Sequence, residues 1–344
     1  MLPGTLLSQT LEQTADSIRK TYHIPELAFA VVSADSVYHS YVGGTPVWGS
    51  GRIAKPSDCF HLGSNTKAIT AFIAADLVKK GQLKWNTRFF ELFPELESSS
   101  RKVYGNITLE MLLTYRGKVP PYTYFLDLPD PKLIKGKFSL QRLLVAQYFL
   151  QQPPMKKEKG LTRSNVDYIL AGLMLEKASG KSYEDLLNEL GERLHIRFGL
   201  NPPVLSDALQ VQGHDAENRP VDVLDVTKLN WLLCAGNIHM NLPDYQVFIQ
   251  EELKAMQGTS TFFTQAEMQH MLFGFRTFSM GWFNFEEGKN HIAHNAGNAA
   301  SFRSDVRILK EANCAIIVLM NASSDTAMMG MNALIEQIVA QYSQ

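Results

Sequence analysis

Hydrophobic residues follow helix-like spacing in some parts of the chain and form short strand-like runs in others. Near the N-terminus, a helical pattern over residues 6–22 precedes two apolar runs of strand length at 27–32 and 37–42. Near the C-terminus, the run CAIIVLM at 314–320 has the length and branching of a buried strand. Residues 327–342 then return to helical spacing. Each end of the chain therefore predicts one helix together with strands.

The middle of the chain is different, because helical patterns dominate it. They cover residues 66–80, 109–114, 140–151, 165–179 and 182–194. The last helix begins with Ser182-Tyr-Glu-Asp185, a capping-box arrangement, and Gly180 ends the helix before it. We therefore expect an α/β (α+β) protein in which both chain ends build one sheet, with an all-helical region inserted between them.

Composition excludes several classes of function. The 344 residues are 45% hydrophobic and 19% charged, with a net charge of −1. This composition suits an ordinary globular core and creates no field that attracts nucleic acid, so no nucleic-acid partner is expected. Three cysteines at wide spacing predict small buried side chains rather than a disulfide framework. The sequence has no HExxH or CxxC pattern, so neither a metal nor a cofactor is expected.

Hydropathy along the chain bears on location. No run reaches the eighteen or so apolar residues that span a bilayer, so no membrane span is expected. The N-terminus lacks the basic start and apolar core of a signal peptide. We expect a soluble protein, cytoplasmic in the form given, or periplasmic or secreted if a leader was removed. The sequence does not indicate an oligomeric state.

The pattern Ser-x-x-Lys occurs three times, at Ser17/Lys20, Ser64/Lys67 and Ser99/Lys102. Only Ser64 follows an apolar stretch, CFHLG, and opens a helix, AITAFIAADLV, that is apolar almost throughout. A serine at a helix N-terminus lies at the positive end of the macrodipole, which favours developing negative charge. Lys67 lies on the same face of the first turn, and burial would help it to become a neutral base. Locally, an ordinary N-cap serine with a surface lysine explains the pattern equally well.

A resemblance over nearly the whole chain favours the catalytic interpretation. Residues 60–96 resemble the nucleophile region of class C β-lactamases, and are similar to that of family VIII esterases and D-alanyl-D-alanine carboxypeptidases. Further segments resemble the same family in the family's order: 24–32, 107–120, 164–187, 278–282 and 316–321.

The resemblance implies a β-lactamase/transpeptidase-like fold with an antiparallel sheet flanked by the terminal helices. It implies a discontinuous sheet domain, 1–60 and 265–344, and a mainly helical region, 61–264, that carries the nucleophile. It also implies a serine hydrolase that forms an acyl-Ser64 intermediate with Lys67 as base. The expected substrate is an ester, or a D-amino-acid peptide or amide of peptidoglycan type. The alternative is a catalytically silent homologue that binds a ligand or protein partner in the same cleft.

The second motif of the family, Tyr-x-Asn or Ser-x-Asn, is altered in this chain. The matching segment is Arg163-Ser164-Asn165. The resemblance implies that Asn165 hydrogen-bonds Lys67 and the amide or ester carbonyl region of the substrate. Arg163 replaces the hydroxyl residue that moves a proton, and a guanidinium cannot act as a general base. Acylation would then depend on Lys67, on water, or on a tyrosine such as Tyr122 or Tyr124. Arg163 is a candidate substrate-binding residue; alternatively, it points away from the site and water fills the gap.

The third motif, Lys-Thr-Gly or His-x-Gly in the family, is altered too. The segment HNAGNAASF at 294–302 permits two registers, with either His294 or Asn295 in the first position. A slip of one residue on a strand exchanges the side chains that face the cleft. The candidate substrate-binding residues are therefore His294, Asn295, Gly297 and Asn298. A backbone N–H at Gly297 or Asn298 would join that of Ser64 in an oxyanion hole.

Overall fold

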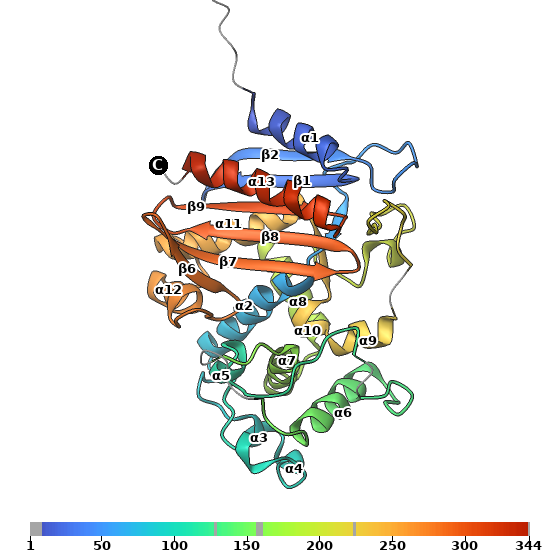
Figure 1. The fold of residues 1–344 in the computed structure, drawn as a ribbon. Coiled ribbons are helices and arrows are strands. Elements are labelled where there is room, and N and C mark those ends of the chain that lie inside the picture. The colour runs from blue at the N-terminus through green and yellow to red at the C-terminus, as the bar shows by residue number, and fades with distance from the viewer. Residues whose placement is uncertain (1–8, 127–128, 156–160, 223–224, 343–344) are drawn as a thin grey trace, which may run out of the picture.

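The computed structural model describes residues 9–126, 129–155, 161–222 and 225–342. Its main element is a six-stranded antiparallel sheet with the order β2-β1-β9-β8-β7-β6 (Figure 1). Two strands come from the start of the chain and four from its end. The strands are β1 (Glu26–Val32), β2 (Val37–Gly44), β6 (Phe283–Glu287), β7 (Asn290–Ala299), β8 (Phe302–Leu309) and β9 (Cys314–Met320). The prediction of one antiparallel sheet built from both chain ends is confirmed.

The terminal helices α1 (Leu11–Thr21) and α13 (Asp325–Tyr342) lie on one face of this sheet (Figure 1). Alternate residues of β1, such as Leu27 and Phe29, pack into the apolar cluster under these helices. The residues between them, such as Ala28, face the other side, where α11 (Leu242–Gln257) contacts β1 and β9. A strand that is buried on both faces needs a continuous apolar run, which explains the pattern at 27–32 and 314–320.

The inserted region is mainly helical, and the five helices expected there are present with shifts of one or two residues at some ends. Its helices are α2 (Thr66–Lys79), α3 (Phe89–Leu92), α4 (Pro94–Glu97), α5 (Leu109–Leu113), α6 (Phe138–Leu150), α7 (Asn165–Ser179), α8 (Tyr183–Leu194), α9 (Val226–Trp231) and α10 (Leu233–Gly236), with α12 (Gln265–Phe273) after α11.

The expectation of an all-helical insertion needs one correction. A second, three-stranded sheet with the order β3-β5-β4 lies within this part of the chain. It consists of β3 (Cys59–His61), β4 (Gly199–Leu200) and β5 (Ile238–Asn241). Strands of two to four residues are too short to produce a readable alternation, so they could not be predicted from the sequence.

Helix ends follow the capping residues. The pattern at 6–22 overestimates the length of α1, because Thr10 caps the helix in a capping box with Gln13. Residues 6–8 lie outside the described residues. The predicted capping box at Ser182 and the left-handed Gly180 at the end of α7 are both present. Cys234 and Cys314 are buried and Cys59 is partly buried, and all three thiols are free.

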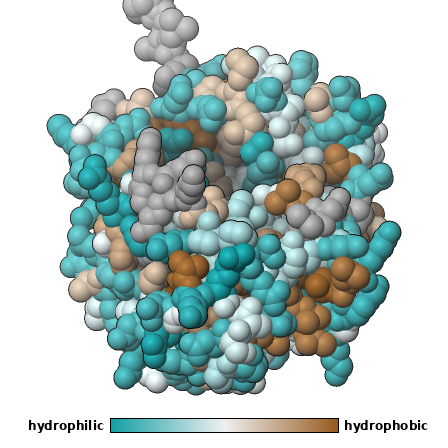
Figure 2. Space-filling model, turned by 60° about the horizontal axis from the view of Figure 1, so that its bottom comes forward, coloured by the Kyte–Doolittle hydropathy of each residue, from teal (hydrophilic) through white to brown (hydrophobic). Residues whose placement is uncertain are grey.

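Figure 2 looks at the end of the molecule formed by the inserted helices, where hydrophobic residues occur as separate patches among hydrophilic ones. Scattered apolar residues of this kind are normal on the surface of a globular protein. Within the described part of the chain, no helix is both long and apolar enough to cross a membrane.

Candidate active site

Ser64 lies in a 3₁₀ turn, Gly63–Asn65, that leads directly into α2. Gly63 has φ = +51°, and a Cβ placed there would lie 2.7 Å from the backbone nitrogen of Asn298. Only glycine fits this close approach and conformation without strain. The Gly63 N–H donates to Nδ1 of His61 at 3.1 Å, and burial lowers the pKa of His61 to about 4. The neutral imidazole therefore fixes the backbone just before the serine.

Lys67 is 2% exposed and lies beside Ser64. Its Nζ is 2.9 Å from Ser64 Oγ and 2.6 Å from the carbonyl oxygen of Ala235. Burial lowers the pKa of Lys67 to about 7, because the charged ammonium is removed from water. Near neutral pH a substantial fraction of the amine is therefore unprotonated and can accept the proton of the serine.

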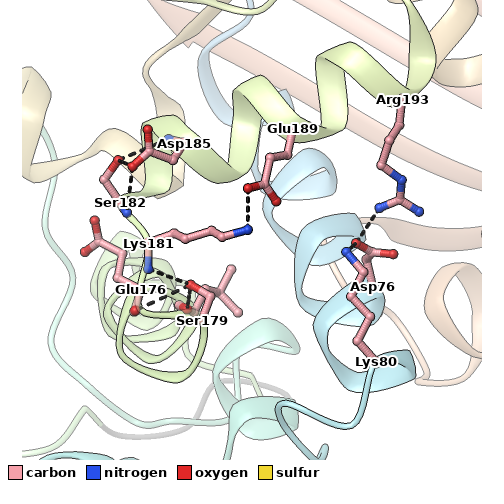
Figure 3. Close-up of polar contacts among 10 residues, drawn as sticks. Asp76, Lys80, Glu176, Ser179, Lys181, Ser182, Asp185, Glu189 and Arg193 are labelled. Atoms are coloured by element: carbon pink, nitrogen blue, oxygen red, sulfur yellow. Dashed lines mark hydrogen bonds and ion pairs between the residues drawn. The ribbon is translucent and has the colours of Figure 1, made fainter.

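The helix that carries the pair is held on several sides. Thr70 Oγ1 contacts the Cys234 carbonyl oxygen at 2.7 Å and the Tyr183 hydroxyl at 2.6 Å. Farther along α2, Asp76 forms ion pairs with Lys80 of the same helix and with Arg193 of α8 (Figure 3). Packing and these polar contacts fix α2, so the positions of Ser64 and Lys67 are set before substrate binds.

The second-motif residues lie at the start of α7. Ser164 caps this helix, and its hydroxyl donates to the Pro120 carbonyl oxygen at 2.6 Å. Asn165 faces the site, and its Nδ2 donates to the Tyr122 carbonyl oxygen at 2.7 Å. Arg163 is exposed, with its guanidinium 4.7 Å from the ring centre of Phe283 on β6. The structure therefore places Asn165 and Arg163 in different surroundings although they are two residues apart.

The geometry of β7 distinguishes the two registers of the third motif. A Cβ on Gly297 would overlap the carbonyl oxygen of Leu62, so this glycine faces the nucleophile turn. Asn295, two residues away, lies on the same side, is 3% exposed and donates to the Gly281 carbonyl oxygen at 2.8 Å. His294 has Nε2 2.7 Å from Asp305 Oδ2 on the neighbouring strand β8. The register with Asn295 in the first position fits this arrangement.

The tyrosines considered as proton carriers are held by other contacts. The ring of Tyr122 is buried against Phe149 and Trp231. The Tyr124 hydroxyl accepts a hydrogen bond from the backbone N–H of Asp225 at 2.6 Å. Tyr124 nevertheless lines the same cavity as Ser64.

A cavity of about 610 Å³ opens in front of Ser64. Of the residues predicted from the sequence, Ser64, Asn165 and Asn298 line it, with Lys67 beneath Ser64. Arg163, His294, Asn295 and Gly297 are not among its lining residues. The lining consists of Gly63, Ser64, Thr123, Tyr124, Phe125, Asn165, Val221, Leu229, Leu232, Ala235, Gly236, Asn298, Ala299, Ala300, Ser301 and Ser323.

Sequence reasoning missed two parts of this site. The apolar wall formed by Val221, Leu229 and Leu232 carries no motif, and the Ala235 carbonyl that contacts Lys67 is a main-chain group. Neither feature has a side-chain signature that a sequence could reveal. Over the described ranges, no group of three or more His, Cys, Asp or Glu side chains could hold a metal ion.

A sheet built from both chain ends, with a serine and a buried lysine at the start of a central helix, is the arrangement of serine β-lactamases and penicillin-binding proteins. The family model described as Beta-lactamase matches residues 11–340 of the chain. The protein belongs to the beta-lactamase family.

Individual relatives are distant. Penicillin-binding protein 4 of Amycolatopsis lactamdurans is 26% identical over 192 residues, which are 55% of this chain and 47% of that protein. Protein flp of Staphylococcus aureus (strain N315) is 21% identical over 319 residues, 88% of this chain and 61% of the relative. The chain thus spans roughly half to three fifths of the length of these curated relatives.

Among solved structures, the class C beta lactamase from Rhodobacter sphaeroides superposes with a TM-score of 0.75 at 18% identity. The match covers 96% of this chain and 99% of that chain. At this identity the likeness establishes the fold.

Proposed function

We propose that the protein is a serine hydrolase that forms an acyl-Ser64 intermediate. The observation that supports this best is the Ser64–Lys67 pair, with 2.9 Å between Oγ and Nζ and a lysine pKa of about 7 caused by burial. A lysine held only for structure gains nothing from burial without a counter-charge, since the desolvation is costly.

In the proposed reaction, neutral Lys67 accepts the Ser64 proton while Oγ attacks the carbonyl carbon of an ester. The backbone N–H groups of Ser64 and Asn298 stabilise the oxyanion, and Asn165 orients the substrate. The intermediate collapses, the ester C–O bond breaks, and the proton on Lys67 passes to the leaving alcohol. Water then attacks the acyl-enzyme with Lys67 again as base, which releases a carboxylic acid and restores Ser64.

Covalent labelling tests this proposal. A fluorophosphonate probe should add one mass equivalent to the protein, and both the label and ester turnover should disappear in Ser64→Ala. Lys67→Ala should lose as much rate as the serine change, because the two residues act as a unit. Ser99→Ala is the matched control, since Ser99 belongs to another Ser-x-x-Lys segment and bonds the Leu96 carbonyl. Undiminished labelling of Ser64→Ala would disprove the nucleophile assignment.

The second candidate is a silent homologue that binds a ligand or protein in the same cleft. It is favoured by Arg163 and Asn295, which stand where the family has a hydroxyl group and a lysine. Ligand binding with no probe label, and with the same affinity in Ser64→Ala, would support it over the hydrolase.

A further inference from the structure

Among the residues that the structure describes, those that line the cavity in front of Ser64 are uncharged. Within the described ranges, its lining contains no Asp, Glu, Lys, Arg or His side chain. The sheet side contributes small or neutral residues of 298–301 together with Ser323, and the helical region contributes aromatic and aliphatic side chains. Its volume of about 610 Å³ lies within the range of about 300–1,000 Å³ that is typical of small-molecule sites.

The positively charged side chains near the cavity, among the described residues, contact other groups of the protein. Arg163 stacks on Phe283 at 4.7 Å, outside the lining. Lys67 is buried between Ser64 Oγ and the Ala235 carbonyl oxygen. Lys228 has Nζ 3.4 Å from the Tyr124 carbonyl oxygen and lies over the Tyr124 ring. None of these three is one of the lining residues that a bound substrate would touch.

This arrangement discriminates between substrates by charge. A carboxylate that enters the cavity loses hydration and gains no cationic partner there, which is unfavourable. A methylene group placed against Leu229 or Leu232 instead leaves water for an apolar surrounding, which is favourable. Selection against a charged group is therefore stronger than selection among neutral acyl chains of different length.

We infer that the cavity takes a neutral ester with an apolar acyl chain, which lies against Val221, Leu229 and Leu232, and that it disfavours acyl groups that carry a carboxylate. This inference rests on the proposed function of Ser64. It assigns a specificity to the site and ranks neutral acyl groups above acyl groups that carry a carboxylate.

The test uses two aryl esters with acyl chains of five carbons, p-nitrophenyl pentanoate and mono-p-nitrophenyl glutarate. The chain of the first ends in a methyl group and that of the second ends in a carboxylate. At pH 8 we expect kcat/KM for the pentanoate to exceed that for the glutarate at least tenfold. Across acetate, butanoate and hexanoate, kcat/KM should rise with chain length. Ser64→Ala gives the background rate for each ester.

A positive charge added to the lining should weaken the preference for the neutral ester. Ser323 lines the cavity and is partly buried, so Ser323→Lys adds a cation to the lining. We expect this variant to lower the pentanoate-to-glutarate ratio at least threefold. Ser206→Lys, at an exposed position outside the lining, is the matched control and should leave the ratio unchanged.

The outcomes separate the inference from the proposed function. Equal or faster turnover of the glutarate by the unmodified protein would overturn the inference while Ser64 remains the nucleophile. Absence of both probe labelling and Ser64-dependent turnover would instead overturn the proposed function. In that case, binding in the cavity is measured without turnover, by comparing the rise in melting temperature caused by pentananilide with that caused by its ω-carboxylate analogue. A larger rise with the carboxylate would overturn the inference.

Discussion

By the resemblance seen in the sequence, Arg163 matches the position of the second-motif hydroxyl, which is expected to move a proton between the nucleophile and the leaving group. The structure leaves its guanidinium exposed and stacked on Phe283, away from the contacts of Lys67. An aryl ester leaves as a stabilised anion and needs little proton donation, whereas an amide or β-lactam nitrogen must be protonated as its bond breaks. The substitution is therefore expected to affect amide and β-lactam substrates more than esters.

We predict that Arg163→Tyr raises β-lactam or amide turnover at least tenfold and changes aryl ester turnover by less than threefold. Arg163→Phe is the matched control, because it removes the guanidinium without supplying a hydroxyl. Steady-state rates on a chromogenic β-lactam and on p-nitrophenyl pentanoate check this for all three proteins. Brisk β-lactam hydrolysis by the unmodified protein would show that another group supplies the proton, and Tyr124 would be the first to mutate.

Among single residues, the Ser64–Lys67 pair could be predicted from the sequence, because a helical spacing of three residues is enough to bring the two side chains together. It could not supply Ala235, whose carbonyl lies 168 residues from Lys67 along the chain and contacts it through the main chain. It also left open whether Lys67 is buried, since burial depends on elements far away in sequence. The roles assigned to Arg163, His294 and Asn295 stay predictions.

Among the elements, the contact between β7 and the nucleophile turn determines the shape of the site. Gly297 faces the Leu62 carbonyl, and Ser304 of β8 donates a hydrogen bond to the same oxygen at 2.7 Å. Next along β7, the Asn298 backbone lies against Gly63. Close approach of two backbones requires glycine on both sides, which explains Gly63 and Gly297 together.

We predict that Gly297→Val reduces probe labelling of Ser64 at least tenfold, because the new side chain separates β7 from the turn and displaces the Asn298 N–H. Overpacking of this kind also costs about 1–3 kcal/mol of unfolding free energy. Ala296→Val is the matched control on the exposed side of the same strand, and it should change neither quantity appreciably. Urea denaturation and labelling kinetics measure both effects. Normal labelling of Gly297→Val would exclude this strand from the oxyanion hole.

Element prediction succeeded where a pattern was long or uninterrupted. The apolar run of β9 and the fifteen-residue helix α7 were placed correctly at both ends. The short strands β3, β4 and β5 were missed, because pairing with distant partners, and not local preference, defines them. The register of the third motif was unreadable for a related reason: only the packing of Gly297 against Leu62 indicates which side chains face inward.

Across the whole molecule, the sheet joins the two chain ends, and the chain leaves this sheet after β2 before it enters the inserted region. Glu26, the first residue of β1, is fully buried close to this junction. It lies near Asp58, whose carboxylate forms an ion pair with Arg52. The division into 1–60 with 265–344 and 61–264 remains a prediction.

Burial raises the pKa of Glu26 from 4.5 to about 9, and the negative charge of Asp58 is the second largest cause of this rise. The positive charges of Arg52 and Arg19 lower the pKa by a smaller amount. The folded state thus holds the protonated carboxyl. The stability that comes from this proton is fully present below pH 4.5 and is lost as the pH rises through about 9. Unfolding free energy should therefore fall between these limits, beyond any change caused by other groups.

We predict that Glu26→Gln, which resembles the protonated form, is more stable than the unmodified protein at pH 8 by up to about 5 kcal/mol, because each pH unit above 4.5 costs the unmodified protein about 1.4 kcal/mol. The difference should shrink towards zero as the pH falls below 4.5, where Glu26 becomes neutral in both states. Urea denaturation at pH 5, 6.5 and 8 measures the trend, and Glu192→Gln on the exposed surface of α8 is the matched control. A Glu26→Gln variant that is less stable at pH 8, or a difference that does not depend on pH, would show that Glu26 is ionised in the folded protein and paired with Arg52.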